Sequence, residues 1–174
     1  MPVPTQKLKE ASSRYPLVKP AASLDAARAA GLQTAYLCYD PKDLLLAEGL
    51  QVLLKDRGWN VFIDYEDELI SDQTSTDQVN QTHARILNCD WFIFLGTVNS
   101  FNSRWCFLEL GYAEGIKPFD SILVIPTKGE NELWYGAELL QLYRHIEVTS
   151  SLRFGAFRPG EDRGVLVADL SIVK

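Results

Sequence analysis

The stretch that decides the fold runs from residue 90 to residue 115 and reads DWFIFLGTVNSFNSRWCFLELGYAEG. Residues 90–95 predict a strand, the most apolar in the chain, and such a run is typical of a strand buried on both faces of a parallel sheet. A polar loop follows, and residues 103–115 predict a helix. The order strand, loop, helix is the repeating unit of an α/β fold.

The same alternation continues on both sides of this stretch. Apolar runs predict further strands at residues 33–39, 60–64, 121–126 and 145–148. Helices are predicted at residues 23–30, from the turn at 41–43 to about residue 57, at 76–87 and at 132–143. Strands separated by helices predict a flavodoxin-like three-layer α/β fold with a central parallel sheet of about five strands. The pattern leaves the strand order open.

The domain organisation follows from these elements. Residues 1–32 are expected to form an N-terminal extension with one short helix, and residues 1–20, with four prolines, read as a loose leader. Residues 33–148 form the α/β domain itself. Residues 149–174 are expected to pack on that domain as a C-terminal segment, in which residues 164–173 fit either a strand or a loose helix.

Composition excludes several classes of function. The net charge is −6 and the pI about 4.9, whereas nucleic-acid-binding proteins usually carry a basic stripe. The sequence contains no run of 18 apolar residues, so no membrane span is predicted. Residues 1–16 lack the apolar core of a secretory signal. The odd number of cysteines fits neither a disulfide framework nor a zinc site. We therefore expect a cytoplasmic protein that binds neither nucleic acid, membrane nor metal.

Polar residues gather where the predicted strands end, which is where α/β sheets bind ligands. The candidates for substrate binding at this rim are Tyr39, Asp40, Asp64, Tyr65, Thr97 and Ser103. Trp105 and Glu109 lie four residues apart, so they share one face of the 103–115 helix. An indole beside a carboxylate can stack on an aromatic base and stabilise a developing positive charge. No G-x-S-x-G, Walker or G-x-G-x-x-G motif points to another enzyme class.

In this order, the pieces resemble a TIR (Toll/interleukin-1 receptor) domain of the standalone prokaryotic, NAD+-cleaving type. Residues 35–43 resemble the family's first strand and loop, with Cys38 in place of the usual serine, and residues 58–64 resemble its second strand. The acidic loop after Asp64 stands where the family has its BB loop, but carries Ser-Asp-Gln instead of Pro-Gly-Asp. Residues 99–110 resemble the family's asparagine, serine, Trp-Cys and glutamate stretch, and the likeness covers residues 33–148.

This resemblance implies an NAD+ nucleosidase, a hydrolase that cuts the nicotinamide–ribose bond and in some members makes a cyclic ADP-ribose signal for antiviral defence. It implies that Glu109 of the W-x-x-x-E pattern is catalytic, with Trp105 as its neighbour. NAD+ is then a substrate, no cofactor is needed, and the protein is expected to form homo-oligomers through TIR–TIR contacts. One carboxylate suffices chemically because nicotinamide leaves as a neutral molecule and needs no general acid.

Alternative interpretations stay open at this point. Glu109 is also readable as a solvated residue or an ion-pair partner of Arg104 or Arg85, and Trp105 as a core anchor. Residues 109–118 also resemble the glutamate helix of nucleoside 2-deoxyribosyltransferases, another N-glycosidic enzyme family. A non-catalytic adaptor that self-associates through the loop after Asp64 is the third alternative.

Overall fold

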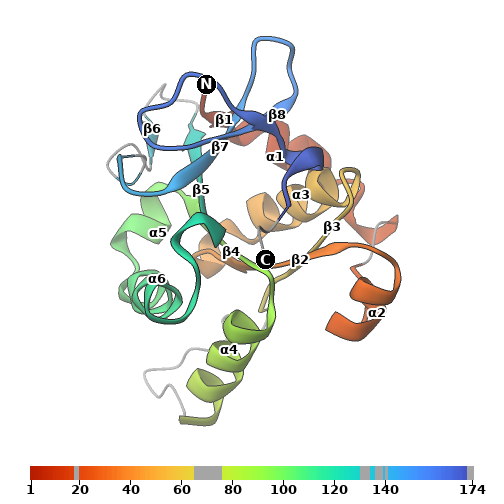
Figure 1. The fold of residues 1–174 in the computed structure, drawn as a ribbon, viewed down its shortest axis with the longest axis vertical. Helices are drawn as coiled ribbons and strands as arrows, with labels where there is room; N and C mark the ends of the chain where they lie inside the picture. The colour runs from red at the N-terminus through yellow and green to blue at the C-terminus, as the bar shows by residue number, and fades with distance from the viewer. Residues whose placement is uncertain (18–19, 65–75, 130–133, 136–138, 140, 172–174) are drawn as a thin grey trace.

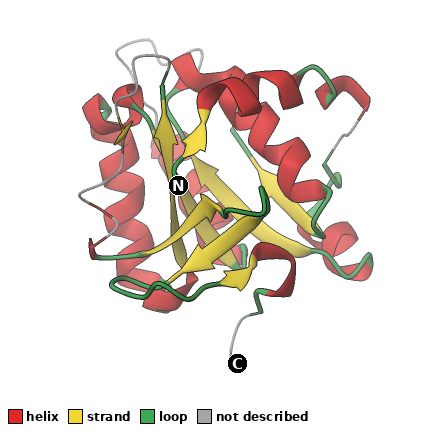
Figure 2. Cartoon of the chain, turned by 90° about the horizontal axis from the view of Figure 1, so that it is seen from above, coloured by secondary structure: helices red, strands yellow, loops and turns green. Residues whose placement is uncertain are grey.

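The computed structural model describes residues 1–17, 20–64, 76–129, 134–135, 139 and 141–171. Its centre is a twisted sheet with helices on both faces (Figures 1 and 2). The parallel strands lie in the order β3-β2-β4-β5-β7. Their bounds, in that order, are Trp59–Phe62, Gln33–Cys38, Trp91–Gly96, Ile122–Lys128 and Arg144–Val148. This is the flavodoxin-like order 2-1-3-4-5, so the predicted fold class is confirmed.

Two apolar cores separate the sheet from its helices. On one face α1 (Thr5–Ser12) and α3 (Leu44–Lys55) pack against the strands. On the other face α4 (Thr76–Asn88) and α6 (Arg104–Ile116) do so, joined at the edge by α2 (Leu24–Ala29). Short 3-10 turns lie at Tyr15–Leu17, Pro41–Asp43, Phe119–Ser121 and Val167–Asp169.

Local signals in the sequence explain where several helices begin and end. The Ser23 hydroxyl accepts a hydrogen bond from the N–H of Ala26 at the start of α2. Gly31 and Gly58, which follow α2 and α3, have positive φ angles, as expected of glycines that end helices. The expected polar loop before α6 contains one more helix, α5 (Val98–Asn102), which begins at a capping box formed by Thr97.

The N-terminal residues are part of the fold, so the expectation of a loose leader is wrong. β1 (Val3–Pro4) pairs in parallel with β5, and α1 packs along α3. The side chains of Val3 and Leu8 are fully buried. The two helices meet at Gly49, where a Cβ atom would lie 1.9 Å from the backbone oxygen of Leu8. A helix of eight residues is too short for its apolar spacing to reveal this packing.

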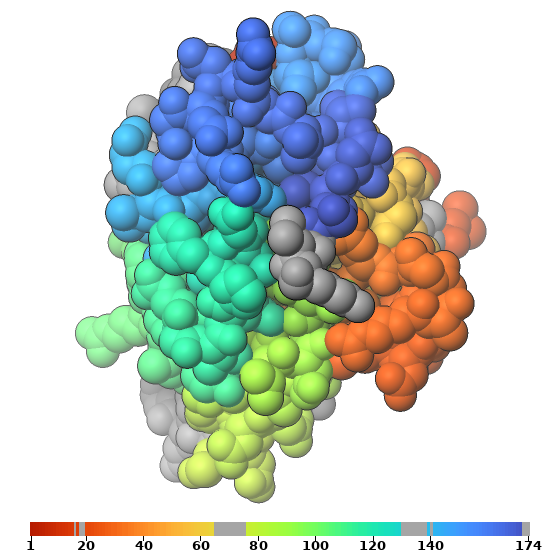
Figure 3. Space-filling model, viewed as in Figure 1, coloured from red at the N-terminus to blue at the C-terminus, as the bar shows by residue number. Residues whose placement is uncertain are grey.

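The chain after β7 extends the sheet. β8 (Phe154–Phe157) pairs antiparallel with β7, and β9 (Val165–Leu166) pairs antiparallel with β8. The Trp59 indole N–H donates to the carbonyl of Val167 at 3.1 Å, which ties the C-terminal segment to β3. In the space-filling view this segment (blue) and α4 (yellow-green) lie at opposite ends of the molecule (Figure 3).

The helix predicted over residues 132–143 is wrong at residues 134–135. These two residues form β6 (Trp134–Tyr135), which pairs antiparallel with the end of β5. Backbone pairing with a neighbouring strand overrides the helical spacing that suggested otherwise. None of the helices described is long and apolar enough to cross a membrane.

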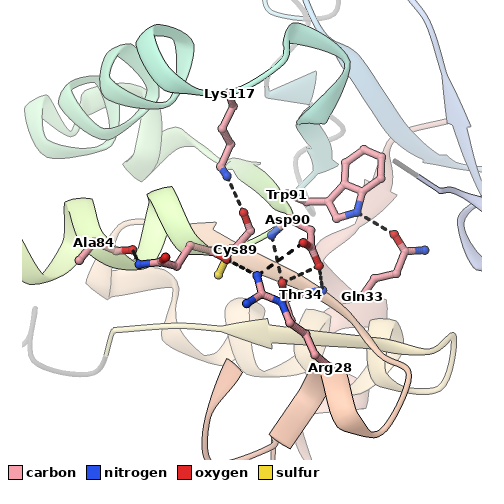
Figure 4. Close-up of polar contacts among 9 residues, drawn as sticks. Arg28, Gln33, Thr34, Ala84, Cys89, Asp90, Trp91 and Lys117 are labelled. Carbon is pink, nitrogen blue, oxygen red and sulfur yellow. Dashed lines mark hydrogen bonds and ion pairs between the residues drawn. The ribbon is translucent and has the colours of Figure 1, made fainter. Parts of the chain in front are cut away.

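A polar network holds the edge of the sheet at which β4 begins (Figure 4). Asp90 Oδ2 accepts hydrogen bonds from the backbone N–H of Thr34 at 3.1 Å and from its hydroxyl at 2.7 Å. Arg28 Nη2 donates to the carbonyl of Asn88 at 2.6 Å. Asn88 is the last residue of α4, and the last backbone carbonyls of a helix have no N–H partner within the helix. The Arg28 guanidinium supplies that missing donor. The network therefore anchors one end of α4 and leaves its earlier turns beside the candidate site.

Candidate active site

Glu109 lies inside the protein, on the face of α6 that packs against the sheet. It shares that face with Cys106, Leu110 and Ala113, which are all buried. Its side chain is 3% exposed. Its Oε1 atom accepts a hydrogen bond from the Tyr36 hydroxyl of β2 at 3.0 Å. A buried carboxylate is costly unless it is hydrogen-bonded, so this position is more than a solvated place on a helix.

A second carboxylate lies on the other side of the same hydroxyl. Asp64, two residues after the end of β3, is 6% exposed, and its Oδ2 lies 3.4 Å from Tyr36 Oη. The Thr82 hydroxyl of α4 donates to the same Oδ2 at 3.2 Å, and the Arg85 guanidinium forms an ion pair with Oδ1. Arg85, one of the basic partners considered for Glu109, thus forms an ion pair with Asp64.

We call Tyr36, Asp64, Thr82, Arg85 and Glu109 the carboxylate cluster. Its members come from β2, the end of β3, α4 and α6, so it joins four elements on one face of the sheet. From the sequence, only its two carboxylates were site candidates, and Arg85 was considered only as an ion-pair partner of Glu109. Tyr36 looked like one more apolar strand residue, because its hydroxyl partners are 28 and 73 residues away in the chain.

Two of the three cysteines, Cys38 and Cys106, lie beside the cluster. Cys38 follows Tyr36 on the same face of β2, and its thiol lies 3.6 Å from the carbonyl oxygen of Cys106. Burial raises the pKa of the Cys38 thiol well above its ordinary value, and the hydrogen bond with Cys106 and the nearby charge of Glu109 raise it further. The thiol therefore keeps its proton at neutral pH and adds no charge to the site.

Trp105 is half-buried, one helical turn before Glu109. Its indole nitrogen is out of contact with solvent and has no hydrogen-bond partner. A buried N–H group without a partner is unusual in a folded protein. Tyr65, the other aromatic candidate, lies outside the described residues.

The remaining predicted site residues have structural partners. The Tyr39 hydroxyl donates to the backbone oxygen of Asp64 at 2.8 Å, and Asp40 Oδ1 accepts from the N–H of Lys42 at 3.1 Å. The Ser103 hydroxyl accepts from the N–H of Cys106 at 3.4 Å and caps α6. Tyr39 thus connects the first strand to the end of β3, whereas Asp40 and Ser103 form the turns that follow β2 and precede α6.

Thr97 belongs to a link across the ends of β2 and β4 that the sequence analysis missed. Its hydroxyl donates to Asp43 Oδ2 at 2.5 Å, and the Asn99 side-chain amide donates to Asp43 Oδ1 at 2.8 Å. Burial raises the pKa of Asp43, although both hydrogen bonds lower it. Because ligands of flavodoxin-like sheets bind between these strand ends, the link shapes the rim of the candidate site.

The helices α4 and α6 also contact each other through two rings. His83 and Tyr112 stack with centroids 3.7 Å apart and ring planes 5° from parallel. His83 follows Thr82 on α4, and Tyr112 lies three residues after Glu109 on α6. Among the residues that the structure describes, no group of three or more His, Cys, Asp or Glu side chains is arranged to hold a metal ion.

Comparison with known proteins adds three findings. A family model described as "TIR domain" matches residues 36–157, more than half of the chain. The protein is 27% identical over 129 residues to "Probable 3' cyclic ADP-D-ribose synthase ThsB'" of Bacillus cereus (strain MSX-D12), and the match covers 66% of this chain and 67% of that protein. The solved structure of Clostridium botulinum CMP N-glycosidase, BcmB, aligns at 23% identity with a TM-score of 0.39, over 53% of this chain and 70% of that one.

Proposed function

Because the chain belongs to the TIR domain family, we propose that it cleaves NAD+ at the nicotinamide–ribose bond, with Glu109 as the catalytic carboxylate. One observation carries the proposal. The glutamate of the family's W-x-x-x-E pattern lies buried on α6, held by the neutral hydroxyl of Tyr36 and one turn after an indole whose N–H has no partner.

The chemistry needs a fixed negative charge beside the ribose. As the bond to nicotinamide breaks, the pyridinium nitrogen takes the bonding electron pair and leaves neutral, while positive charge develops on the ribose ring. A carboxylate held beside that ring stabilises the charge by about 3–4 kcal/mol, by analogy with one well-placed catalytic dipole. The burial of Glu109 strengthens this effect, because charges interact more strongly away from water. The step uses neither metal nor cofactor.

The product we propose is a cyclic ADP-ribose. The Bacillus cereus relative is named as a probable 3' cyclic ADP-D-ribose synthase. Cyclisation requires that a nucleophile within the ADP-ribose moiety reaches the ribose carbon before water does. A site closed to water supports this outcome, and the half-buried Trp105 offers an aromatic surface one helical turn from Glu109 to hold the adenine end.

The other rim residues are proposed to bind the rest of NAD+. Tyr39, Asp40, Asp64, Tyr65, Thr97 and Ser103 are the candidates. Tyr39 and Thr97 are proposed to act mainly by shaping the rim, since their hydroxyls already have protein partners. Further proposals follow from the family. We propose that the protein works in the cytoplasm, where NAD+ is available, and that it is active as a homo-oligomer. We also propose a role in antiviral defence, through NAD+ loss or through the cyclic product.

The test is incubation of the purified protein with NAD+, followed by chromatography and mass spectrometry of the products. We expect nicotinamide and a cyclic ADP-ribose, and Glu109→Gln should reduce the rate by about 10²–10³-fold, as the loss of one preorganised electrostatic group does. Glu114→Gln is the matched control, because Glu114 also accepts a hydrogen bond from a tyrosine hydroxyl and lies further along α6. Its rate should equal that of the wild type.

The same assay separates the alternatives. A parallel incubation with a deoxynucleoside and a free base would reveal base exchange if the protein were a deoxyribosyltransferase. No reaction with either substrate at high protein concentration would refute the enzymatic proposal and favour an adaptor. Light scattering gives the oligomeric state at each protein concentration. Comparing it with the specific activity at the same concentration shows whether activity rises with self-association.

A further inference from the structure

We propose that the protein has a second ligand site, which binds a small organic phosphate on the opposite face of the sheet from the carboxylate cluster. The site is a cavity of about 390 Å³ between the end of α3 and the strands β8 and β9. We call it the arginine pocket, because Arg57 and Arg153 both line it. Phe154 of this pocket belongs to the core beneath α1 and α3, whereas Tyr36 of the cluster belongs to the other core. Phosphate binding here does not require that the protein cleaves NAD+.

The walls of the arginine pocket combine apolar and cationic groups. The two cations lie at the ends of elements, since Arg57 follows α3 and Arg153 precedes β8. The apolar wall consists of Leu53 of α3, Phe154 of β8, Leu166 of β9 and Ala168. Small-molecule sites are typically cavities of about 300–1,000 Å³ in which an apolar wall accompanies a few polar groups that orient the ligand. The arginine pocket has this size and this make-up.

The guanidinium of Arg57 is held in place without being neutralised. Its Cζ atom lies 4.6 Å from the centroid of the buried Phe154 ring, and its Nη1 atom donates to the carbonyl oxygen of Leu53. Lys7 Nζ lies 5.1 Å from the same ring centroid and adds a further positive charge. Burial lowers the pKa of Arg57, although nearby Asp56 raises it, and an arginine keeps its charge at neutral pH. A fixed, partly desolvated cation attracts an anion more strongly than one surrounded by water.

A tight turn brings Arg153 to the other side of α3. The backbone N–H of Thr149 donates to the carbonyl oxygen of Arg153 at 2.8 Å, and the Thr149 hydroxyl accepts from the Arg153 N–H at 3.2 Å. Inside this turn Leu152 has a φ angle of 59°, in the left-handed region that leucine rarely adopts. Its side chain is 71% exposed, so burial of the leucine does not explain the strained backbone. The turn fixes the backbone of Arg153, whose side chain lines the cavity.

The arginine pocket is positively charged in a protein whose net charge is −6. Within the part of the chain that the structure describes, Arg57 and Arg153 form no ion pair with a carboxylate. Asp56, the carboxylate that lines the pocket, already accepts from both terminal nitrogens of Arg14, at 3.1 and 3.2 Å. Two guanidinium groups therefore remain for one anion. A phosphate monoester fits them, because it carries a charge of about −1.5 to −2 at pH 7 and three acceptor oxygens. The apolar wall then contacts its organic part.

AMP is the probe for this site, because it carries one phosphate on an organic body. Inorganic phosphate and adenosine serve as its two separate parts. Two-dimensional ¹H–¹⁵N NMR follows the side-chain Nε–H signals of Arg57 and Arg153 during each titration, with Arg57→Lys and Arg153→Gln used for assignment. These two signals report on the arginine pocket itself, which total binding would not, because AMP is also a part of NAD+.

We expect AMP to move both arginine signals in a saturable way. Inorganic phosphate should move them at higher concentrations, and adenosine should leave them in place. Arg153→Gln should raise the Kd of AMP, measured at the Arg57 signal, about ten- to hundredfold, the range expected for hydrogen bonds to a charged group. Arg163→Gln is the matched control, because it removes the same charge from an exposed arginine beyond Val165, toward the far end of β8. Its Kd should equal that of the wild type.

Three results would overturn the proposal. The first is that both arginine signals stay in place at millimolar AMP. The second is an equal rise in Kd in Arg153→Gln and Arg163→Gln, which would mean that AMP responds only to the overall charge. The third is that adenosine moves the signals as AMP does, so that the phosphate contributes nothing. A wild-type protein that releases no nicotinamide from NAD+ would refute the proposed function and leave these measurements unaffected, so the two proposals fail separately.

Discussion

Gly49→Ala tests whether the N-terminal helix is an integral part of the fold. The added Cβ atom would lie 1.9 Å from the backbone oxygen of Leu8 and 2.6 Å from its carbonyl carbon. The first distance falls about 1.5 Å short of ordinary van der Waals contact. A backbone atom cannot rotate away as a side chain does, so α1 must move off α3.

The magnitude follows from what α1 buries. Displacing it disturbs the packing of Leu8 and Ala11, both buried, against α3. Overpacking of this kind costs about 2–3 kcal/mol. For a chain of this length, each kcal/mol lowers the melting temperature by about 2–4 °C, so we expect a decrease of about 4–12 °C.

Gly111→Ala is the control, because a Cβ atom there meets nothing within 4 Å. Gly111 lies in the middle of α6 and is exposed, so alanine should stabilise the protein by about 0.5–1 kcal/mol. Differential scanning calorimetry of both variants at one protein concentration gives the comparison. A melting temperature for Gly49→Ala equal to or above that of the wild type would refute the packing of α1 on α3.

The remaining predictions concern charge and thiols. Burial raises the pKa of Asp43 above its ordinary 3.8, so the folded state holds the proton of this carboxyl group more tightly than the unfolded chain does. The stability that Asp43 contributes is therefore greatest below about pH 3.8 and falls as the pH rises. The stability difference between wild type and Asp43→Asn should therefore shrink from pH 3 to pH 7 in urea titrations, and a difference that grows over this range would contradict the reasoning. Ellman's reagent should react with the three buried cysteines only after unfolding, since burial also raises the pKa of Cys89 to about 12; rapid reaction of a native thiol would show that the site region opens.

Much of the local structure could be predicted from the sequence because its causes are local. Apolar runs such as residues 90–95 predicted the parallel strands, and Ser23, Gly31 and Gly58 marked helix boundaries that the structure confirms. The signal failed where an element is short or is decided by its neighbour. α1 was missed, and residues 134–135 pair with β5 instead of forming a helix.

The candidate site divides in the same way. The sequence by itself determined the fold class and, through the W-x-x-x-E pattern, brought Glu109 forward as the catalytic candidate. Only the tertiary structure decided the strand order, the burial of that carboxylate and its partner, because Tyr36 lies 73 residues away from Glu109 and meets it only when β2 and α6 pack together. A hydrogen bond across such a separation leaves no periodic pattern in the chain, since it depends on the packing of whole elements and not on the residues between them.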